Sequence, residues 1–186
     1  TGASLAGKRL QDNVGGIRVS ATSTTTYKTL AINAGAAGNA AAAGSANSIT
    51  HGGKTSAIVS GSTLTSQQGE AAVLAGDYAN AFTSLTTVGA ASTAAAALGV
   101  SIVDSAHQTS AAIENSAVEA DKVRLEAEAK EGFSSILINA GAAMTAAGAA
   151  TASDVTQGSS VATMLTGSTI EGKDYTQKAD YYGSIA

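Results

Sequence analysis

The chain lacks cysteine, proline and tryptophan. Without cysteine it has no disulfide, no thiolate nucleophile and no cysteine-based zinc site. Without proline, nothing in its 186 residues has to interrupt a long regular element. It has only two histidines, His51 and His107, which excludes a histidine-rich metal site. We therefore expect no catalytic residue, no cofactor and no metal ion.

Charge is also scarce, at 13% of residues with a net charge of −4 and no basic run. Nucleic-acid binding is excluded, because the chain lacks the broad electrostatic attraction that phosphates demand. Residues 29–53, 78–103 and 132–153 carry no charge at all and are long enough to span a bilayer. Ser, Thr, Asn and Gly interrupt them, and their apolar residues are mainly alanine, which favours buried soluble helices over membrane spans.

An internal repeat is present. Residues 49–64 recur as 155–170, and 33–37 recur as 139–143, both at the same offset (155 − 49 and 139 − 33, each 106). Two matches at one offset indicate a duplication. We expect one body, 1–186, in which 1–80 repeats as 107–186 and 81–106 links the copies.

Alanine and the absence of proline predict long helices. The clearest covers Ser110 to Ala150, because opposite charges four residues apart, such as Arg124 and Glu128, are neighbours on a helix. A second is expected from Gln67 to about Ser105, and a third over 27–46. The predicted fold is all-α, two pseudo-repeated helical hairpins with a long central alanine-rich helix.

The block Gly-Ala-Ala occurs three times, at 35–37, 89–91 and 141–143, with spacings of 54 and 52 residues. Helix backbones approach closely where bulky side chains are absent, so these blocks predict packing faces. A general alanine bias of the genome is the alternative explanation. Tyr181 and Tyr182 are expected either to anchor an interface or to dock the C-terminal segment onto the body. The predicted interface residues are Gly35, Ala36, Gly89, Ala90, Gly141, Ala142, Tyr181 and Tyr182.

Reactive side chains form no convincing constellation. Gly53-Lys54-Thr55 has the end of a phosphate-binding loop but lacks its first glycine, since that position is Ser48. Asp104 and His107 are three residues apart and could share a cation on one helix face, but two ligands do not hold a metal against water. The alternating charges of 114–131 are typical of a solvated or partner-facing surface.

Residues Ser60 to Ala112 resemble the second half of the small helical-hairpin proteins of type VII secretion. The resemblance rests on a Ser/Thr/Gly turn that opens an alanine-rich amphipathic segment with one aromatic in its stripe; Ser60-Gly61-Ser62-Thr63 stands in place of the family's Trp-x-Gly turn. It implies a helical, secreted partner protein that binds and delivers another protein.

Two functions follow from these patterns. The first is a non-enzymatic structural subunit that self-associates through Gly/Ala-rich helix faces into an oligomer or filament, with copies of itself as partner. The alternative is the secreted partner protein of a type VII-like export system. The expected location is extracellular or at the cell surface. The Thr1 to Arg9 segment has no apolar signal region, so any cleaved leader is expected to be gone already.

Overall fold

The computed structural model describes residues 1–13 and 15–186, and this part of the chain is built of strands without any helix. The all-α prediction is therefore wrong, and with it the helical bundle and the likeness to type VII helical hairpins. The strands are β1 (Gly2–Ala6), β2 (Arg9–Asp12), β3 (Gly16–Ala37), β4 (Ala40–Ser60), β5 (Thr63–Ala91), β6 (Ala94–Glu114), β7 (Ala117–Ala142), β8 (Ala146–Gln157), β9 (Ser160–Thr166), β10 (Thr169–Glu171) and β11 (Asp174–Ile185).

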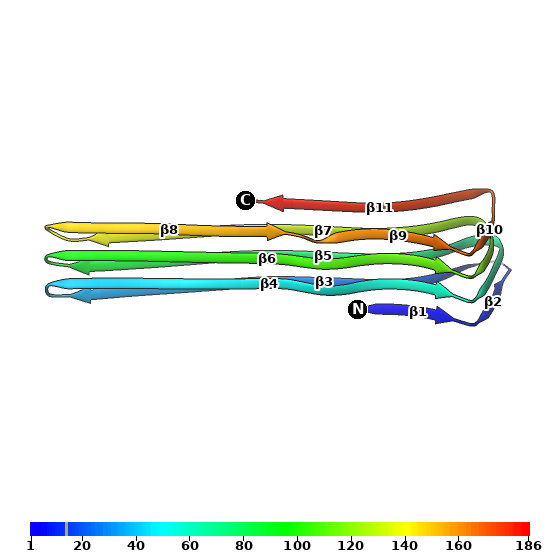
Figure 1. Ribbon diagram of the computed structural model, residues 1–186, viewed down its shortest axis with the longest axis horizontal. Coiled ribbons are helices and arrows are strands. Elements are labelled where there is room, and N and C mark those ends of the chain that lie inside the picture. The colour runs from blue at the N-terminus through cyan, green and yellow to red at the C-terminus, as the bar shows by residue number, and fades with distance from the viewer. Residues whose placement is uncertain (14) are drawn as a thin grey trace.

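These strands form two parallel sheets that face each other as layers of one flat, elongated body (Figure 1). Sheet A has the order β1-β4-β6-β8, with β9 also beside β6. Sheet B has the order β10-β7-β5-β2, with β3 beside β5 and β11 beside β7. The chain runs along sheet B, turns, and returns along sheet A. At about 3.3 Å per residue, the 29 residues of β5 span roughly 95 Å.

We call one pass through sheet B and back through sheet A a rung. The first complete rung is β2, β3 and β4, the second is β5 and β6, and the third is β7, β8 and β9; β10 and β11 begin a fourth. Equivalent residues of successive rungs are 54 or 52 positions apart. The 106-residue offset therefore spans two rungs, and residues 81–106 belong to the middle rung. This is the architecture of a β-solenoid.

The strict alternation of charged and apolar residues explains why the predicted helix of residues 110–150 is instead made of strands. Between Lys122 and Lys130, the charged side chains at even positions face solvent. The odd positions Val123, Leu125, Ala127 and Ala129 face the core. The sequence spacing of four is shared by one face of a helix and one face of a strand, so the charge pairs did not distinguish them. In the strand, Arg124 pairs with Glu126, two residues away, at 2.5 Å.

The same reading corrects the other predicted helices. Residues 67–105 fill most of β5 and β6, and residues 27–46 cross from β3 into β4. The stretches 50–60 and 160–166, rich in Ser and Thr, are also strands, and each ends in a tight turn. Among the described residues, no helix is long and apolar enough to cross a membrane.

The turns from sheet A to sheet B repeat one backbone conformation in each rung. Gly7, Gly61, Asn115 and Gly167 all have a φ between 47° and 60°, the left-handed region. The serine after the last three of them caps the turn. Ser62, Ser116 and Ser168 each donate a hydrogen bond to a carbonyl two residues earlier, and each hydroxyl accepts the amide of the preceding rung. The turns thus stack as a ladder.

Gly61→Ala tests this turn ladder. A Cβ at Gly61 would meet no atom within 4 Å, so any loss of stability comes from its φ of 55°. We expect the free energy of unfolding to fall by about 1–2 kcal/mol. Gly38→Ala, in the opposite turn, is the matched control, because its Cβ also meets nothing and its φ is not left-handed. Equal effects of the two substitutions in urea unfolding would refute the turn assignment.

The core between the sheets is divided along the strands. Near the serine turns it is apolar, with Val59, Leu64, Ile113, Val123 and Leu125 among its buried members. A belt of buried polar side chains follows, and beyond it lies a smaller apolar cluster of Ile49, Ala81, Val103 and Phe133.

At the far end the two sheets approach unusually closely. A Cβ on Gly35, Gly89 or Gly141 would lie 2.5–2.9 Å from a carbonyl oxygen of the opposite sheet. The asparagine two residues before the first and third of these glycines donates a hydrogen bond to a carbonyl of sheet A. The three glycine blocks therefore mark a contact between the two sheets of one chain.

Candidate functional site: a buried histidine and aspartate cluster

Three titratable side chains meet in the polar belt. His51 Nε2 lies 2.9 Å from Asp77 Oδ2, and His107 Nε2 lies 3.5 Å from Asp77 Oδ1. One ligand-type atom from each residue lies within 4.8 Å of the others, and all three residues are buried. We call these residues the His-Asp cluster.

The fold brings the cluster together from three strands and both sheets. His51 is on β4 and His107 on β6 of sheet A, while Asp77 is on β5 of the facing sheet B. All three occupy odd positions, which point inward in these parts of their strands. In-register pairing sets His51 beside Ser105 and His107 beside Gly53, so the two imidazoles lie on adjacent strands, offset by two residues.

Neighbouring groups fix the two rings. The imidazoles are stacked, with centroids 4.8 Å apart and planes inclined by 9°. The hydroxyl of Thr55 lies 3.0 Å from His107 Nε2, and the Tyr27 hydroxyl lies 3.4 Å from His51 Nδ1. Each ring is therefore held by at least one contact besides Asp77.

The buried carboxylate of Asp77 is only partly satisfied by hydrogen bonds. Asp77 is 0% exposed, and its Oδ1 has no hydrogen-bond partner. Burial lowers the pKa of His107 below its ordinary value; the neighbouring His51 adds to this shift, and the attraction of Asp77 and Glu131 opposes it. Neutral imidazole is thus the favoured form of His107, which leaves it free to act as a ligand.

The structure separates residues that the sequence placed together. Asp104 is on the outward, exposed face of β6, whereas His107 faces inward, because residues three apart in a strand lie on opposite faces. They share no cation site. Ser101 and Ser105 face inward with His107. Lys54 and Thr55, from the incomplete phosphate loop, lie in the middle of β4, with no helix to follow them.

The predicted interface residues fall in two places. Gly35, Gly89 and Gly141 face the opposite sheet, and the alanines after them lie near the ends of sheet B strands. Tyr181 lies on β11, and its hydroxyl donates a 3.0 Å hydrogen bond to Glu131, a buried residue of β7.

Burial and the bond to Glu131 raise the pKa of Tyr181 to about 12. Tyr182 points elsewhere: its ring lies 5.5 Å from the Lys130 ammonium, and its hydroxyl donates to Asp180. Tyr181 thus fits the second of the two roles expected for it, docking of the C-terminal segment. A contact of these residues with another molecule stays a prediction.

Asp77 is the residue that sequence reasoning missed. It is 26 residues from His51 and 30 from His107, and only the winding of the rungs makes them neighbours. A signal was available, because the spacing of 54 and 52 between the glycine blocks is the length of a rung. Aligning the chain at that period places His51 and His107 two positions apart on adjacent strands.

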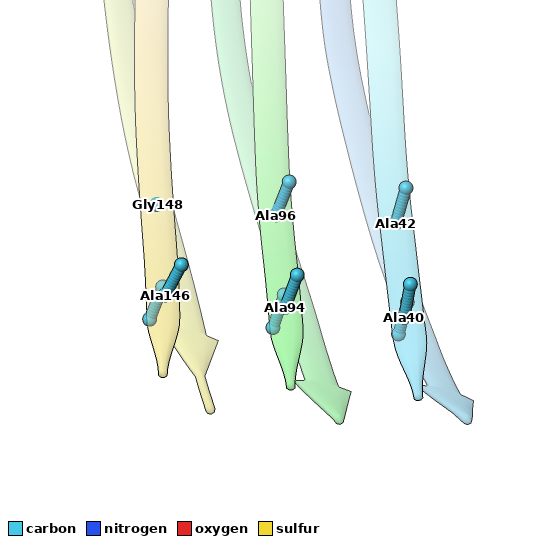
Figure 2. A pocket seen from close by; sticks show the side chains of 9 residues that line it. Ala40, Ala42, Ala94, Ala96, Ala146 and Gly148 are labelled. Atoms are coloured by element: carbon cyan, nitrogen blue, oxygen red, sulfur yellow. The ribbon is translucent and has the colours of Figure 1, made fainter. Parts of the chain in front are cut away.

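A hollow at the glycine end of sheet A offers no comparable chemistry. Figure 2 shows the same two positions on three neighbouring strands: Ala40 and Ala42, Ala94 and Ala96, Ala146 and Gly148. Its lining is alanine and glycine throughout, without a polar side chain. The His-Asp cluster, by contrast, brings buried titratable groups together. No protein-family model matches this chain, and neither a curated protein nor a solved structure does.

Proposed function

We propose that this protein is a non-enzymatic structural subunit that self-associates through the outer face of sheet B. The observation that carries the proposal is a group of exposed apolar side chains on three adjacent strands, which we call the apolar B face. Its members are Leu30 and Ile32 on β3, Phe82 and Val88 on β5, and Ile136 and Ile138 on β7.

These side chains face outward because of strand alternation. They occupy even positions, and the odd positions between them face the core. Leu30 and Ile32 are 71% and 72% exposed. Groups of exposed apolar side chains this close together are uncommon on monomers and mark surfaces that another molecule covers.

The surroundings of the face favour an uncharged partner. The charge-free segments 29–53, 78–103 and 132–153 overlap in register, so at the glycine end of the solenoid neither sheet carries a charged side chain on the described strands. At the border of this region, Lys28 on β3 is in register with Phe82. A partner with a charged binding surface would lose hydration there without gaining an ion pair.

A second copy fits the face by symmetry. Leu30, Ser84 and Ile136 are in register across sheet B, and so are Ile32, Thr86 and Ile138. A two-fold axis along β5 exchanges β3 and β7, so it places leucine or isoleucine on isoleucine and hydroxyl on hydroxyl. Such a self-complementary contact is what a two-fold dimer requires.

Burial of the apolar B face releases enough free energy to offset the cost of association. Taking a leucine or isoleucine fully out of water contributes about 1.5–3 kcal/mol. These six side chains are 39–72% exposed, so each copy would bury the equivalent of about three full side chains, and the two copies together can offset an association cost of roughly 4–15 kcal/mol. The alanine-rich core, in which few large side chains are buried, gives a single chain reason to gain stability from assembly.

The double variant Ile32→Lys, Ile138→Lys tests the proposal, because the two-fold axis brings these positions together and the substitution sets like charges against each other. We expect the wild-type protein to be a dimer in size-exclusion chromatography with light scattering, and the variant to be a monomer with an unchanged circular dichroism spectrum.

Leu98→Lys, Ile102→Lys is the matched control, since it places the same charges on exposed apolar positions of sheet A. The control should remain a dimer. A monomeric wild type at about 100 µM would refute self-association, and dissociation of the control alone would move the interface to sheet A. An assembly insensitive to both would place the contact at the sheet edges. The extracellular or cell-surface location stays a prediction.

A further inference from the structure

The His-Asp cluster presents a set of donor atoms that its internal hydrogen bonds leave incomplete. Two imidazole nitrogens of sheet A converge on one carboxylate of sheet B. A buried carboxylate is stable only when it is paired or coordinates a cation. The 3.5 Å separation from His107 Nε2 leaves Asp77 Oδ1 without a hydrogen bond.

The chemistry of the donors indicates which cation would complete the set. Imidazole nitrogen and carboxylate oxygen are ligands of Zn²⁺ and its neighbours in the transition series, whereas Ca²⁺ and Mg²⁺ prefer oxygen alone. Three protein ligands with water in the fourth position is the common arrangement of catalytic zinc sites, whereas structural sites usually have four protein ligands.

The spacing of the donors is close to what such an ion needs. With bonds of about 2.0–2.1 Å, tetrahedral ligand atoms lie roughly 3.3 Å apart. His51 Nε2 lies 2.9 Å from Asp77 Oδ2 and His107 Nε2 lies 3.5 Å from Asp77 Oδ1, distances that bracket this value. One ligand atom from each of the three residues lies within 4.8 Å of the others. The imidazoles would have to rotate out of their stacked arrangement to share an ion, because a metal bonds to each nitrogen in the plane of its ring.

The surrounding residues support the ring positions. Tyr27 contacts Nδ1 of His51, the nitrogen that faces away from Asp77, and this is the place of an outer-shell partner in metal sites. The hydroxyl of Thr55, 3.0 Å from His107 Nε2, is a further oxygen beside the cluster.

We propose that His51, Asp77 and His107 bind one divalent transition-metal ion, best Zn²⁺, which links the two sheets across the polar belt. The ion would neutralise the buried carboxylate and tie β4 and β6 to β5. Burial favours a structural role over a catalytic one in spite of the three-ligand set, because all three ligands are buried and none of them lines a described pocket.

The test uses the untagged chain, unfolded and refolded at pH 7.5 with Zn²⁺ or with a chelator, because a buried site fills most readily during folding. After removal of loose metal, we expect one zinc per chain by elemental analysis and a higher midpoint of thermal unfolding in the zinc-loaded protein. Co²⁺ should bind at the same ratio and give the visible absorption of a four-coordinate site with nitrogen and oxygen ligands.

Two carboxylate variants locate the ion. Asp77→Asn should weaken zinc binding by at least about 100-fold, because it removes one of three ligands. Asp104→Asn, a neighbouring but outward-facing carboxylate, should bind zinc as the wild type does. His107→Gln should behave as Asp77→Asn.

The wild-type chain alone can overturn the proposal, so misfolding of a variant does not protect it. The chain has no cysteine and no third histidine, so stoichiometric imidazole-ligated metal can only be at this cluster. Refolded wild type that retains less than a tenth of an equivalent of zinc, with an unchanged unfolding midpoint, would show that protons alone satisfy the cluster. Equal loss of binding in Asp104→Asn would also refute it.

Discussion

Gly89→Leu is expected to unfold the protein or to lower its free energy of unfolding by at least about 3 kcal/mol. A Cβ at this position would lie 2.5 Å from the carbonyl oxygen of Ala96 and 3.1 Å from its carbonyl carbon. Both atoms are backbone of the opposite sheet, so no side chain can rotate away. The middle rung is held on both sides, and relief requires the two sheets to separate.

Gly44→Leu is the matched control, because it makes the same change on an exposed position of β4. A Cβ there would lie 4.0 Å from the carbonyl oxygen of Leu98, its register partner on β6, which is ordinary van der Waals contact. Urea unfolding followed by circular dichroism measures both variants. If Gly89→Leu kept wild-type stability and lost only its oligomeric state, the glycines would form an intermolecular contact and the account of the sheet approach would be wrong.

Leu125→Ala is expected to lower the free energy of unfolding by about 2–5 kcal/mol. Leu125 is fully buried on β7, in the apolar core beside the serine turns. Few large side chains share that core with it, and its neighbours are mostly valine and alanine, which cannot extend to fill the space left by an isobutyl group. The cavity therefore persists, and its cost adds to the lost burial.

Leu98→Ala provides the comparison, since Leu98 is 54% exposed on the outer face of sheet A. Its effect on the monomer should stay within about 0.5 kcal/mol. Both variants are measured by urea unfolding, and their data are fitted with a common dependence of the free energy of unfolding on urea concentration. Similar losses of stability for the two leucines would mean that alternation along the strand does not decide which side chains are buried. That result would contradict the strand assignment.

The sequence was sufficient to find the repeat but not to read its period. The matches of 33–37 with 139–143 and the glycine blocks at 54 and 52 residues are both consequences of stacked rungs. The first match spans two rungs and suggested a duplication of halves. The second gives the rung length itself, but close approach of backbones was attributed to helices.

The prediction of helices failed for a physical reason. Alanine has the highest intrinsic helix propensity, yet in a ladder of small residues it lets two sheets lie close together, and tertiary packing overrides the propensity. The decisive pattern lay in Lys122 to Lys130, where charged and apolar residues alternate strictly, as a half-buried strand requires. The absence of proline suits uninterrupted strands as well as helices.

The candidate site was less accessible to sequence reasoning. His51 and His107 were noted as the only histidines, but their partner Asp77 lies on another strand of another sheet. Long-range pairing of this kind depends on the register of the rungs, and the register is set by turns such as that at Gly61 and Ser62. The pairing of Asp104 with His107 relied on helical geometry and failed with it.

The distance between spin labels at positions 128 and 140 tests the central claim most directly. The chain has no cysteine, so Glu128→Cys and Ala140→Cys give two unique labelling sites on the outer face of β7. Twelve residues of strand span roughly 40 Å, whereas twelve residues of helix span about 18 Å. A second pair, at Ala34 and Ala140, is two strands apart in register and should lie about 10 Å apart. The account predicts about 40 Å for the first pair and strong dipolar broadening for the second; about 18 Å for the first, or no broadening for the second, would contradict it.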